Sequence, residues 1–547
     1  MRWKVLARIK STKLQERREE IVKALFKNRD LKTKKQQKEF LNPKDPCQLT
    51  LQDVGISLVQ LNKALKRIRQ AIKKKEKVIV YGDYDTDGVC ATAIMWETLN
   101  KLGLDVLPFI PRREEGYGLK ASIINQMAKE GVKLIITVDQ GIVAYRQVTR
   151  AKKTGIDVII TDHHQPGKKK PKAKAIIHTT QLAGCGVAWF LAKWLVEKIK
   201  SKAKPLGLDL VTIGTITDMV PLIGPNRSIV KFGLSQVNKT KRAGLLALYQ
   251  FAGLDKKKID TYEVGFIIGP RINASGRMDD PMEALRLICT NDENRAISLA
   301  QKIDQKNRER QELMKQTTLH ARELWLKEDG ESSLIFIYHQ SYEHGVVGLV
   351  ASKLKDEFYR PAIILAPRKD RWVGSGRSIE EFNIIEAIRE LKDIIGDHGG
   401  HRLAAGFDVS QEKLEEAKQR LIKKAEKDLG KKKLGPRIEI EIEVELIDLN
   451  LALYQEVNKF APFGMNNPQP VFSSRQVRIA NLKKVGADNQ HLKFRVNGFE
   501  VIAFGQGELL PQLSTKQPVD LAYNLFLNQW NGLQRLELKI KDIKIPE

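Results

Sequence analysis

The chain has 547 residues, 42% of them hydrophobic, which is the composition of a globular protein too long for a single core. No run of about eighteen apolar residues is present and the N-terminus lacks the apolar stretch of a signal peptide, so we expect a soluble, cytoplasmic protein. The 94 Lys and Arg residues outnumber the 66 Asp and Glu residues by 28, which indicates a polyanionic partner, with nucleic acid the leading candidate.

The first half of the chain changes pattern near residue 76. Residues 1–75 read as a basic helical region that ends in an amphipathic stretch over 58–72. Apolar runs then alternate with helical segments. Strands are predicted at 78–80, 106–110, 134–138, 157–161 and 175–177, and helices at 89–102, 119–129, 144–154 and from 187 onwards. This alternation predicts an α/β domain with a parallel, doubly wound sheet over residues 76–280.

The second half predicts a connector and two further domains. The charged helical stretch from 282 to 326 predicts a long connecting helix within residues 281–330. A second α/β domain begins at the apolar run 334–337 and occupies residues 331–430. After the lysine-rich segment 431–433, short alternating segments with glycine turns predict a small β-barrel over residues 431–547.

The most informative stretch is DYDTDG at residues 83–88, directly after the apolar run 78–80. It places three carboxylates at the C-terminal end of a predicted strand, where ligands bind in open α/β sheets. Carboxylates this close repel one another unless cations neutralise them. The position and the chemistry predict a metal site, and a solvated acidic turn is the alternative for any single D-x-D.

Three later segments end in the same kind of side chain. The segment 134–138 ends at Asp139, the segment 157–161 leads to Asp162, His163 and His164, and the segment 211–216 leads to Asp218. Parallel strands would bring these ends together on one edge of the sheet. Carboxylate and imidazole ligands suit Mn²⁺ or a similar ion, and the lack of thiolates argues against structural zinc. Two ions about 3.5–4 Å apart are the standard device for phosphoryl hydrolysis.

Simpler explanations exist for each of these residues taken singly. Each aspartate precedes a predicted helix, so each could be an N-cap. A His-His pair is often a surface or core feature without a ligand. An N-cap explains one such aspartate but not all four, and histidines beside an Asp at a strand end favour a metal or phosphate contact.

Four motifs resemble those of the DHH phosphoesterase superfamily: DYDTDG, TVDQG (137–141), TDHH (161–164) and GTITDMVPL (214–222). Further segments are similar to the RecJ single-strand-specific exonucleases. These are GPRINASGRM (269–278), GVVGLVAS (345–352), GSGRS (374–378), GGH (399–401), PFG (462–464) and HLK (491–493). The resemblance covers nearly the whole chain from about residue 40. It implies a DHH phosphoesterase domain, a DHH-associated domain joined by a long helix, and a C-terminal OB-fold.

The resemblance also implies roles for individual residues. The implied metal ligands are Asp83, Asp85, Asp87, Asp139, His163 and Asp218, and the implied cofactors are two divalent ions, Mn²⁺ or Mg²⁺. Besides Asp139, the implied catalytic residues are His164, in contact with the scissile phosphate or a metal, and Asp162, which would orient the histidines. The implied phosphate-binding residues are Arg271, Arg277, Ser375, Arg377 and His401. Ordinary turn chemistry would explain the glycines of GSGRS and GGH but not their Arg and His.

Two positions depart from the family pattern. Gln140 stands where family members commonly have Cys, and His178-Thr179-Thr180 replaces the usual Asn-Pro loop after the DHH motif. The ligand Asp139 is kept, so the departures concern the substrate loop and not the metal centre. The OB-like region predicts a single-strand groove in which aromatic residues stack on bases. Tyr454, Phe460, Phe463 and Trp530 are candidates for stacking, with a place in the core as the alternative for each.

The implied function is a single-stranded-DNA-specific 5′→3′ exonuclease that releases 5′-mononucleotides by two-metal hydrolysis in DNA repair and recombination. The implied partners are single-stranded DNA, a helicase and a single-strand-binding protein, and we expect a monomer. One alternative is a nano-RNase or cyclic-dinucleotide phosphodiesterase of the same superfamily, which would need neither the OB region nor the charge of +28. Another is a non-catalytic replication scaffold, which would lack metal ligands. A pyrophosphatase is disfavoured by the chain length.

Overall fold

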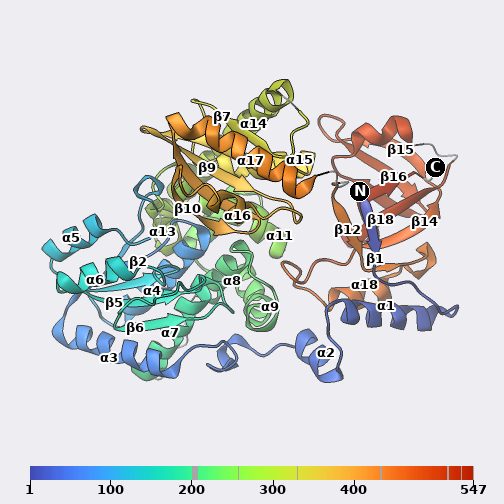
Figure 1. Ribbon diagram of the computed structural model, residues 1–547. Coiled ribbons are helices and arrows are strands. Elements are labelled where there is room, and N and C mark those ends of the chain that lie inside the picture. Colours follow the sequence, from blue (N-terminus) through green and yellow to red (C-terminus); the bar gives the residue numbers. More distant parts are fainter. Residues whose placement is uncertain are drawn as a thin grey trace. The chain divides into compact units, whose positions relative to one another are not determined.

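The computed structural model describes residues 1–547 except 117, 200–206, 257, 329, 431–433, 514–516, 531–532 and 546–547. The chain forms two compact units (Figure 1). One unit contains residues 55–218 and 236–435, and the other contains residues 1–54, 219–235 and 436–547. Among the described residues no helix is both long and apolar enough to cross a membrane.

The first unit begins with a five-stranded, wholly parallel sheet in the order β3-β2-β4-β5-β6. The strands are β2 (Lys77–Tyr81), β3 (Val106–Phe109), β4 (Val132–Val138), β5 (Asp157–Asp162) and β6 (Ala175–His178). The helices around it are α3 (Leu58–Lys74), α4 (Thr86–Lys101), α5 (Ala121–Lys129), α6 (Tyr145–Lys153), α7 (Gly184–Ile199) and α8 (Leu208–Thr217). The predicted doubly wound α/β domain is confirmed.

Burial on both faces explains why these strands are continuous apolar runs. Ile79 of β2 and Ile135 of β4 pack with Ile124 of α5 and Val148 of α6 on one face. Helices α4 and α7 contact the sheet as well and pack on each other. A strand covered on both sides has no polar face, so its sequence does not alternate.

One predicted segment has a different conformation. The sequence predicts a strand-like segment at the apolar run 211–216, but this run lies within helix α8 and Asp218 follows the end of that helix. Leu210 to Ile216 are all buried, so the run has no polar stripe to reveal a helical period. A short, fully buried helix and a buried strand cannot be told apart by hydrophobic pattern alone.

A series of helices, most of them short, leads from the parallel sheet to a second sheet. They are α10 (Ala243–Phe251), α11 (Thr261–Glu263), a π-helical turn (Val264–Ile268), α12 (Gly269–Met278), α13 (Met282–Cys289) and the 36-residue α14 (Glu293–Glu328). The predicted connector over 282–326 is therefore two helices, because α13 ends at Cys289 and the chain turns before Glu293.

The second sheet of this unit has the order β10-β11-β9-β8-β7 and is antiparallel except for the β7–β8 pair. Its strands are β7 (Ile335–Tyr338), β8 (Ala362–Arg368), β9 (Arg371–Arg377), β10 (Ile395–His401) and β11 (Ala404–Ser410). Helices α16 (Ile384–Arg389) and α17 (Leu414–Leu429) contribute to one core, and α14 and α15 (Val347–Phe358) contribute to another.

The other unit contains a seven-stranded sheet in the order β13-β14-β18-β19-β17-β16-β15. The strands of this sheet are β13 (Ile442–Glu443), β14 (Phe472–Val477), β15 (Ala480–Val485), β16 (His491–Val496), β17 (Phe499–Ala503), β18 (Val519–Trp530) and β19 (Leu533–Lys544). The unit also contains β12 (Arg437–Ile440), outside this sheet, and helix α18 (Leu451–Asn458). The buried Arg227, in the first turn of helix α9 (Gly224–Asn238), donates to the carbonyls of Phe40 and Ala461.

The N-terminal residues differ most from the sequence-based expectation of one basic helical region over 1–75. The chain begins with strand β1 (Arg2–Val5), which pairs in parallel with β12, more than 400 residues away. Helices α1 (Leu14–Asn28) and α2 (Lys34–Leu41) follow, and Phe26 and Phe40 pack on Phe460. Helix α3 belongs to the other unit. A pairing between sequence-distant segments leaves no local signal, so the sequence does not predict that residues 1–54 join the C-terminal domain.

Candidate active site

The acidic and histidine side chains lie at the C-terminal edge of the parallel sheet. Asp83 follows β2, Asp139 follows β4, and His163 and His164 follow β5. Asp85 caps α4 by accepting a hydrogen bond from Gly88 N at 2.9 Å. Strand order β2-β4-β5 makes these three strands neighbours, so their ends meet. Asp218 reaches the same place from the end of α8.

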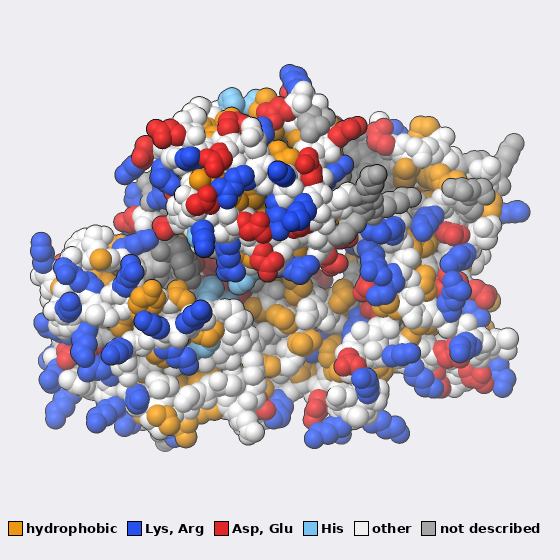
Figure 2. Space-filling model, in the orientation of Figure 1, with side chains coloured by type: hydrophobic (Ala, Val, Ile, Leu, Met, Phe, Trp, Pro, Cys, Tyr) orange, Lys and Arg blue, Asp and Glu red, His pale blue; other side chains and the backbone are white. Residues whose placement is uncertain are grey.

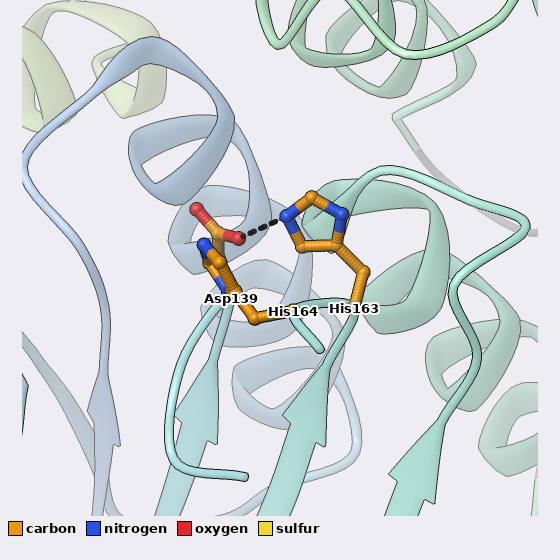
Figure 3. Close-up of side chains that lie close together, drawn as sticks. All are labelled: Asp139, His163 and His164. Carbon is orange, nitrogen blue, oxygen red and sulfur yellow. Dashed lines mark ion pairs between the residues drawn. The ribbon is translucent and has the colours of Figure 1, made fainter. Parts of the chain in front are cut away.

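Three overlapping groups of ligand atoms form there, and within each group the atoms lie within 4.8 Å of one another. The groups are Asp83, Asp85 and Asp139; Asp87, His163 and Asp218; and Asp139, His163 and His164. His163 connects them, since its Nε2 is 3.2 Å from Asp139 Oδ1 and its Nδ1 is 3.6 Å from Asp218 Oδ2. Figure 3 shows the Asp139 and His163 side chains pointing toward one another.

Backbone geometry brings the cluster together at two points. Asp139 has φ +59°, in the left-handed region that side chains rarely adopt, which is a strain typical of functional positions. Gly184 begins α7 against this residue, and a Cβ there would lie 2.2 Å from Asp139 Oδ1. The backbone N–H groups of Gly184 and Cys185 donate to Asp87 at 2.7 and 3.0 Å. A helix N-terminus thus binds one carboxylate and its glycine leaves room for another.

Burial and mutual repulsion work against the charges of this cluster. Burial, and then the neighbouring Asp85, raise the pKa of Asp83 to about 8. Burial, and then Asp87 and Asp85, raise the pKa of Asp218 to about 9. The same two causes raise the pKa of Asp85, and they raise that of Asp139 well above its usual range. The folded chain holds carboxylates together at a cost that a bound cation would relieve.

The donor set fits divalent cations. Asp139 Oδ1 and Asp218 Oδ2 are buried, and neither accepts a hydrogen bond among the described residues, although nitrogens of His163 lie 3.2 and 3.6 Å away. Buried polar atoms are almost always satisfied, so two such oxygens in one cluster point to a missing ligand. Carboxylate oxygens with imidazole nitrogen match the preferences of Mn²⁺ and Mg²⁺ better than those of a structural zinc.

Asp162 differs from the other carboxylates because it is neutralised. It is buried, and its Oδ1 lies 2.8 Å from His164 Nδ1 while its Oδ2 accepts from Ile142 N at 2.8 Å. Although burial opposes it, hydrogen bonding by His164 lowers the pKa of Asp162. Burial likewise opposes the charge of His164, but Asp162 and the nearby carboxylates raise its pKa. Asp162 therefore orients His164, whose side chain is 41% exposed.

A cluster of four arginines, Arg113, Arg277, Arg310 and Arg377, lies beside the acidic cluster. Burial, and then repulsion by Arg113, Arg310 and Arg377, lower the pKa of Arg277 to about 10, and the carboxylate of Asp85 only partly offsets this. Burial also lowers the pKa of Arg377, whose Nη1 donates to Ser375 Oγ at 3.2 Å. Arg277 Nη1 donates to Gly345 O at 3.2 Å. These guanidinium groups repel one another next to the acidic cluster, an arrangement that suits a phosphate.

The other two predicted phosphate-binding residues, Arg271 and His401, lie in different environments. Arg271 is already paired, since its Nε donates to Asp304 at 2.9 Å and its Nη1 to Ile267 O at 2.9 Å. Its guanidinium thus joins α12 to α14, and its predicted phosphate contact stays a prediction. His401 is exposed at the end of β10, next to Gly399 and Gly400.

Two arginines of this site carry no sequence signal. Arg113 lies in the loop after β3, with its guanidinium 4.7 Å from the ring centroid of Tyr84. Arg310 is on α14 and donates to Asn307 at 2.9 Å. Neither belongs to a motif: the segment after β3 brings in Arg113, and the packing of α14 on α12 brings in Arg310. Gln140 replaces the family cysteine and donates to Gly82 O, which links the loop after β4 to the loop after β2.

The aromatic candidates of the C-terminal unit are mostly core residues. Phe460 is 1% exposed, and Tyr454 and Phe463 pack partly buried against the same core. The side chain of Trp530 lies outside the described residues. The visible face of the molecule carries Lys and Arg over much of its area and in no single patch (Figure 2).

Family models match three regions: a DHH family N-terminal domain at residues 77–215, a DHHA1 domain at 331–427 and a RecJ OB domain at 440–542. The chain is 35% identical to the single-stranded-DNA-specific exonuclease RecJ of Bacillus subtilis, across 100% of this chain and 71% of that protein. It is 32% identical to Escherichia coli RecJ, across 88% of this chain and 90% of that protein. The chain belongs to the RecJ family.

Solved RecJ structures agree with this. The Mn²⁺ complex of Thermus thermophilus RecJ superimposes with a TM-score of 0.83 at 29% identity, covering 100% of this chain and 80% of that one. The Mg²⁺ complex of the same protein gives a TM-score of 0.78 at 28% identity, covering 100% and 79%. These comparisons confirm two predictions made from the motifs: the C-terminal OB-fold and membership of the RecJ exonuclease family.

Proposed function

We propose that this RecJ-family protein is a metal-dependent exonuclease that degrades single-stranded DNA from the 5′ end and releases 5′-mononucleotides. The observation that carries the proposal is the buried carboxylate cluster with two unsatisfied oxygens beside a cluster of arginines. The family relationship supports the substrate and the reaction class. The role would be in DNA repair and recombination.

The proposed cofactors are two divalent ions, Mn²⁺ or Mg²⁺. They would be held by Asp83, Asp85, Asp87, Asp139, His163 and Asp218, whose ligand atoms form the overlapping groups described above. When bound, such ions lower the pKa of water and stabilise charge on a phosphoryl group. The carboxylates supply the negative charge that retains the ions, and the tight loops at Asp139 and Gly184 fix the ligand positions.

The remaining residues would position the scissile phosphate. His164 is held by Asp162 through its Nδ1, and its imidazole would donate to a phosphate oxygen. Arg277 and Arg377, with Ser375 and Arg113, would bind the terminal phosphate of the strand through paired N–H groups. His401, exposed and next to two glycines, would contact the backbone of the strand. Arg271, which also pairs with Asp304, stays a predicted phosphate-binding residue.

Further proposals concern organisation and partners. A division into a region over 1–75, a DHH domain over 76–280, a connector, a DHHA1 domain over 331–430 and an OB domain over 431–547 is compatible with the three matched regions. The N-terminal part would be split at residue 54. The protein would act in the cytoplasm as a monomer, with a helicase that opens duplex ends and a single-strand-binding protein.

The test is digestion of single strands labelled at the 5′ or the 3′ end, DNA and RNA in parallel, with Mn²⁺, Mg²⁺ or chelator. We expect immediate release of 5′-labelled mononucleotide, with the 3′ label remaining on progressively shorter strands. Release of mononucleotides from the 3′ end alone would contradict the polarity, and full activity in chelator would contradict the metal requirement. A preference for cyclic dinucleotides or very short RNA would instead favour the phosphodiesterase alternative.

A further inference from the structure

Two aromatic side chains stand exposed on the segment between α10 and α12. Tyr262 is 59% exposed and Phe266 is 71% exposed, the largest exposed fraction among the large hydrophobic residues that are described. Their rings are stacked, with centroids 5.0 Å apart and planes inclined by 29°. Single exposed apolar residues are common on protein surfaces, but a stacked pair with this much accessible ring is not explained by packing.

The backbone beneath the pair is unusual. Tyr262 lies in the short helix α11, where Asp260 and Glu263 form a capping box, and Phe266 lies in the π-helical turn Val264–Ile268. Within this turn, Val264 and Ile268 are buried while Phe266 points outward. Single π-helical turns occur frequently at functional sites because they redirect side chains within a helix.

This segment is attached directly to the elements that carry the candidate metal ligands. A Cβ on Gly265 would lie 3.7 Å from Ile216, and one on Gly269 would lie 2.3 Å from Thr217 Cγ2, so the segment packs closely on the last turn of α8. Asp218 follows Thr217. The carbonyl of Gly269 also accepts a hydrogen bond from Thr86 Oγ1 at 3.1 Å, between Asp85 and Asp87 in the chain. Phe266 precedes Gly269 by three residues, about one helical turn.

Charges of both signs lie near the pair, within a chain whose net charge is +28. Lys256 and Lys258 are exposed in the loop that leads to α11, and among the described residues neither forms an ion pair. Asp255, Asp260 and Glu263 also lie near the pair, and the carboxylates of Asp260 and Glu263 each accept one backbone N–H of their own capping box. A chain that is basic and carries a flat apolar face matches the composition of single-strand-binding surfaces, in which cations follow the backbone and aromatic rings stack on bases.

We propose that Tyr262 and Phe266 form a base-stacking platform for the single strand, a few nucleotides from the phosphate that is hydrolysed. The proposal rests on the proposed function, since it takes the substrate to be single-stranded DNA. The unpaired bases of such a strand present flat apolar faces, which would cover the exposed rings of Tyr262 and Phe266. Stacking on the platform would hold the strand in register while the terminal phosphodiester lies at the metal centre.

The experiment combines alanine variants with abasic substrates. A single abasic residue is moved along a 5′-phosphorylated oligonucleotide, from the second to about the twelfth position, and the kcat/KM of the first cleavage is measured by rapid quench. For the wild type we expect a fall at one or two adjacent positions, of about five- to 150-fold, the range of one base–aromatic stack. Phe266→Ala should lose a similar factor on the intact strand and should lose the dependence on abasic position.

Matched variants separate stacking from a general apolar contact. Phe266→Trp should keep the wild-type dependence of kcat/KM on abasic position, whereas Phe266→Leu should lose it as Phe266→Ala does. Tyr262→Ala should flatten the profile as well. Leu319→Ala removes an apolar side chain that is 51% exposed on α14 and should change nothing. Since the altered side chains are exposed, thermal unfolding of all variants should match that of the wild type.

The possible contrary results are distinct. A wild-type profile without position dependence, or one that Phe266→Ala retains at full depth, overturns the platform while leaving the exonuclease intact. Wild-type activity in Phe266→Leu also overturns it and would favour a protein partner on the same surface. A wild type that releases no nucleotide from the intact strand refutes the proposed function, and the platform with it.

Discussion

Two buried clusters of opposite charge lie side by side in the parallel-sheet unit. In the acidic cluster, burial and mutual repulsion raise the pKa values of Asp83, Asp139 and Asp218, and in the basic cluster they lower that of Arg277. Each cluster makes its own members less stable in their charged forms. Each therefore calls for an ion of the opposite sign, a divalent cation for one and a phosphate for the other.

The comparison also separates functional charges from structural ones. Asp162 and Arg271 lie in the same region, but Asp162 is paired with His164 and Arg271 with Asp304. A paired charge stabilises the fold and has little left to offer a ligand. An unpaired buried charge destabilises the free protein and is retained for what it binds. We therefore expect mutation of Asp139 and Arg377 to lower activity without loss of stability. We expect mutation of Asp162 and Arg271 to lower stability.

The largest effect is expected for Asp139→Asn. Loss of one ligand should lower the exonuclease kcat by about 10³-fold or more, because a metal centre supplies several kcal/mol of transition-state stabilisation. The same change removes a repelling charge, so the metal-free protein should unfold at a higher temperature than the wild type. Thermal unfolding with and without Mn²⁺ measures both effects. If Asp139→Asn kept full activity and its metal-free form were less stable than the wild type, the assignment of the acidic cluster as a metal site would be wrong.

Arg377→Met should come next. Removal of a preorganised phosphate donor should cost about 10²- to 10³-fold in kcat/KM on 5′-phosphorylated strands. Stability should stay equal or rise, since burial already disfavours this charge. The control is a strand that lacks the 5′-phosphate, on which wild type and variant should differ much less. An equal loss on both substrates would contradict a role at the terminal phosphate.

The third prediction compares Asp162→Asn, which alters a carboxylate paired with His164, with Asp139→Asn. An orienting residue behind a histidine is worth about 10- to 100-fold in activity. Here the metal-free protein should become less stable, because hydrogen bonding by His164 lowers the pKa of Asp162 in the fold. That contribution to stability is present above the ordinary Asp pKa and is lost as the pH falls through the lowered one. If both asparagine variants shifted the unfolding temperature in the same direction, the distinction would fail.

Arg271→Gln should have the smallest effect on activity, less than about threefold on the folded enzyme. Its cost should appear in stability, about 3 kcal/mol, because Asp304 is buried and would lose one of its two arginine partners. Denaturant unfolding of Arg271→Gln and Asp304→Asn, alone and combined, gives the coupling between them. A loss of activity as large as that of Arg377→Met, with unchanged stability, would restore Arg271 as a phosphate-binding residue.

The sequence by itself determined the parallel sheet and most of the acidic cluster. Strands buried on both faces are continuous apolar runs, and the aspartates that follow β2 and β4 stand at strand ends that must meet when the strands are neighbours. Local pattern and chemistry coincide there, so motif and geometry give the same answer. The same holds for Ser375 and Arg377, which lie on one strand.

Only the tertiary structure decided which charges are paired. Arg271 and Arg277 stand six residues apart in one motif, yet the packing of α12 against α14 provides Asp304 to the first and leaves the second repelled by Arg113, Arg310 and Arg377. The pairing of β1 with β12 and the exposure of Tyr262 and Phe266 were invisible for the same reason. Electrostatic and packing partners are set by distance in space, and a sequence records only distance along the chain.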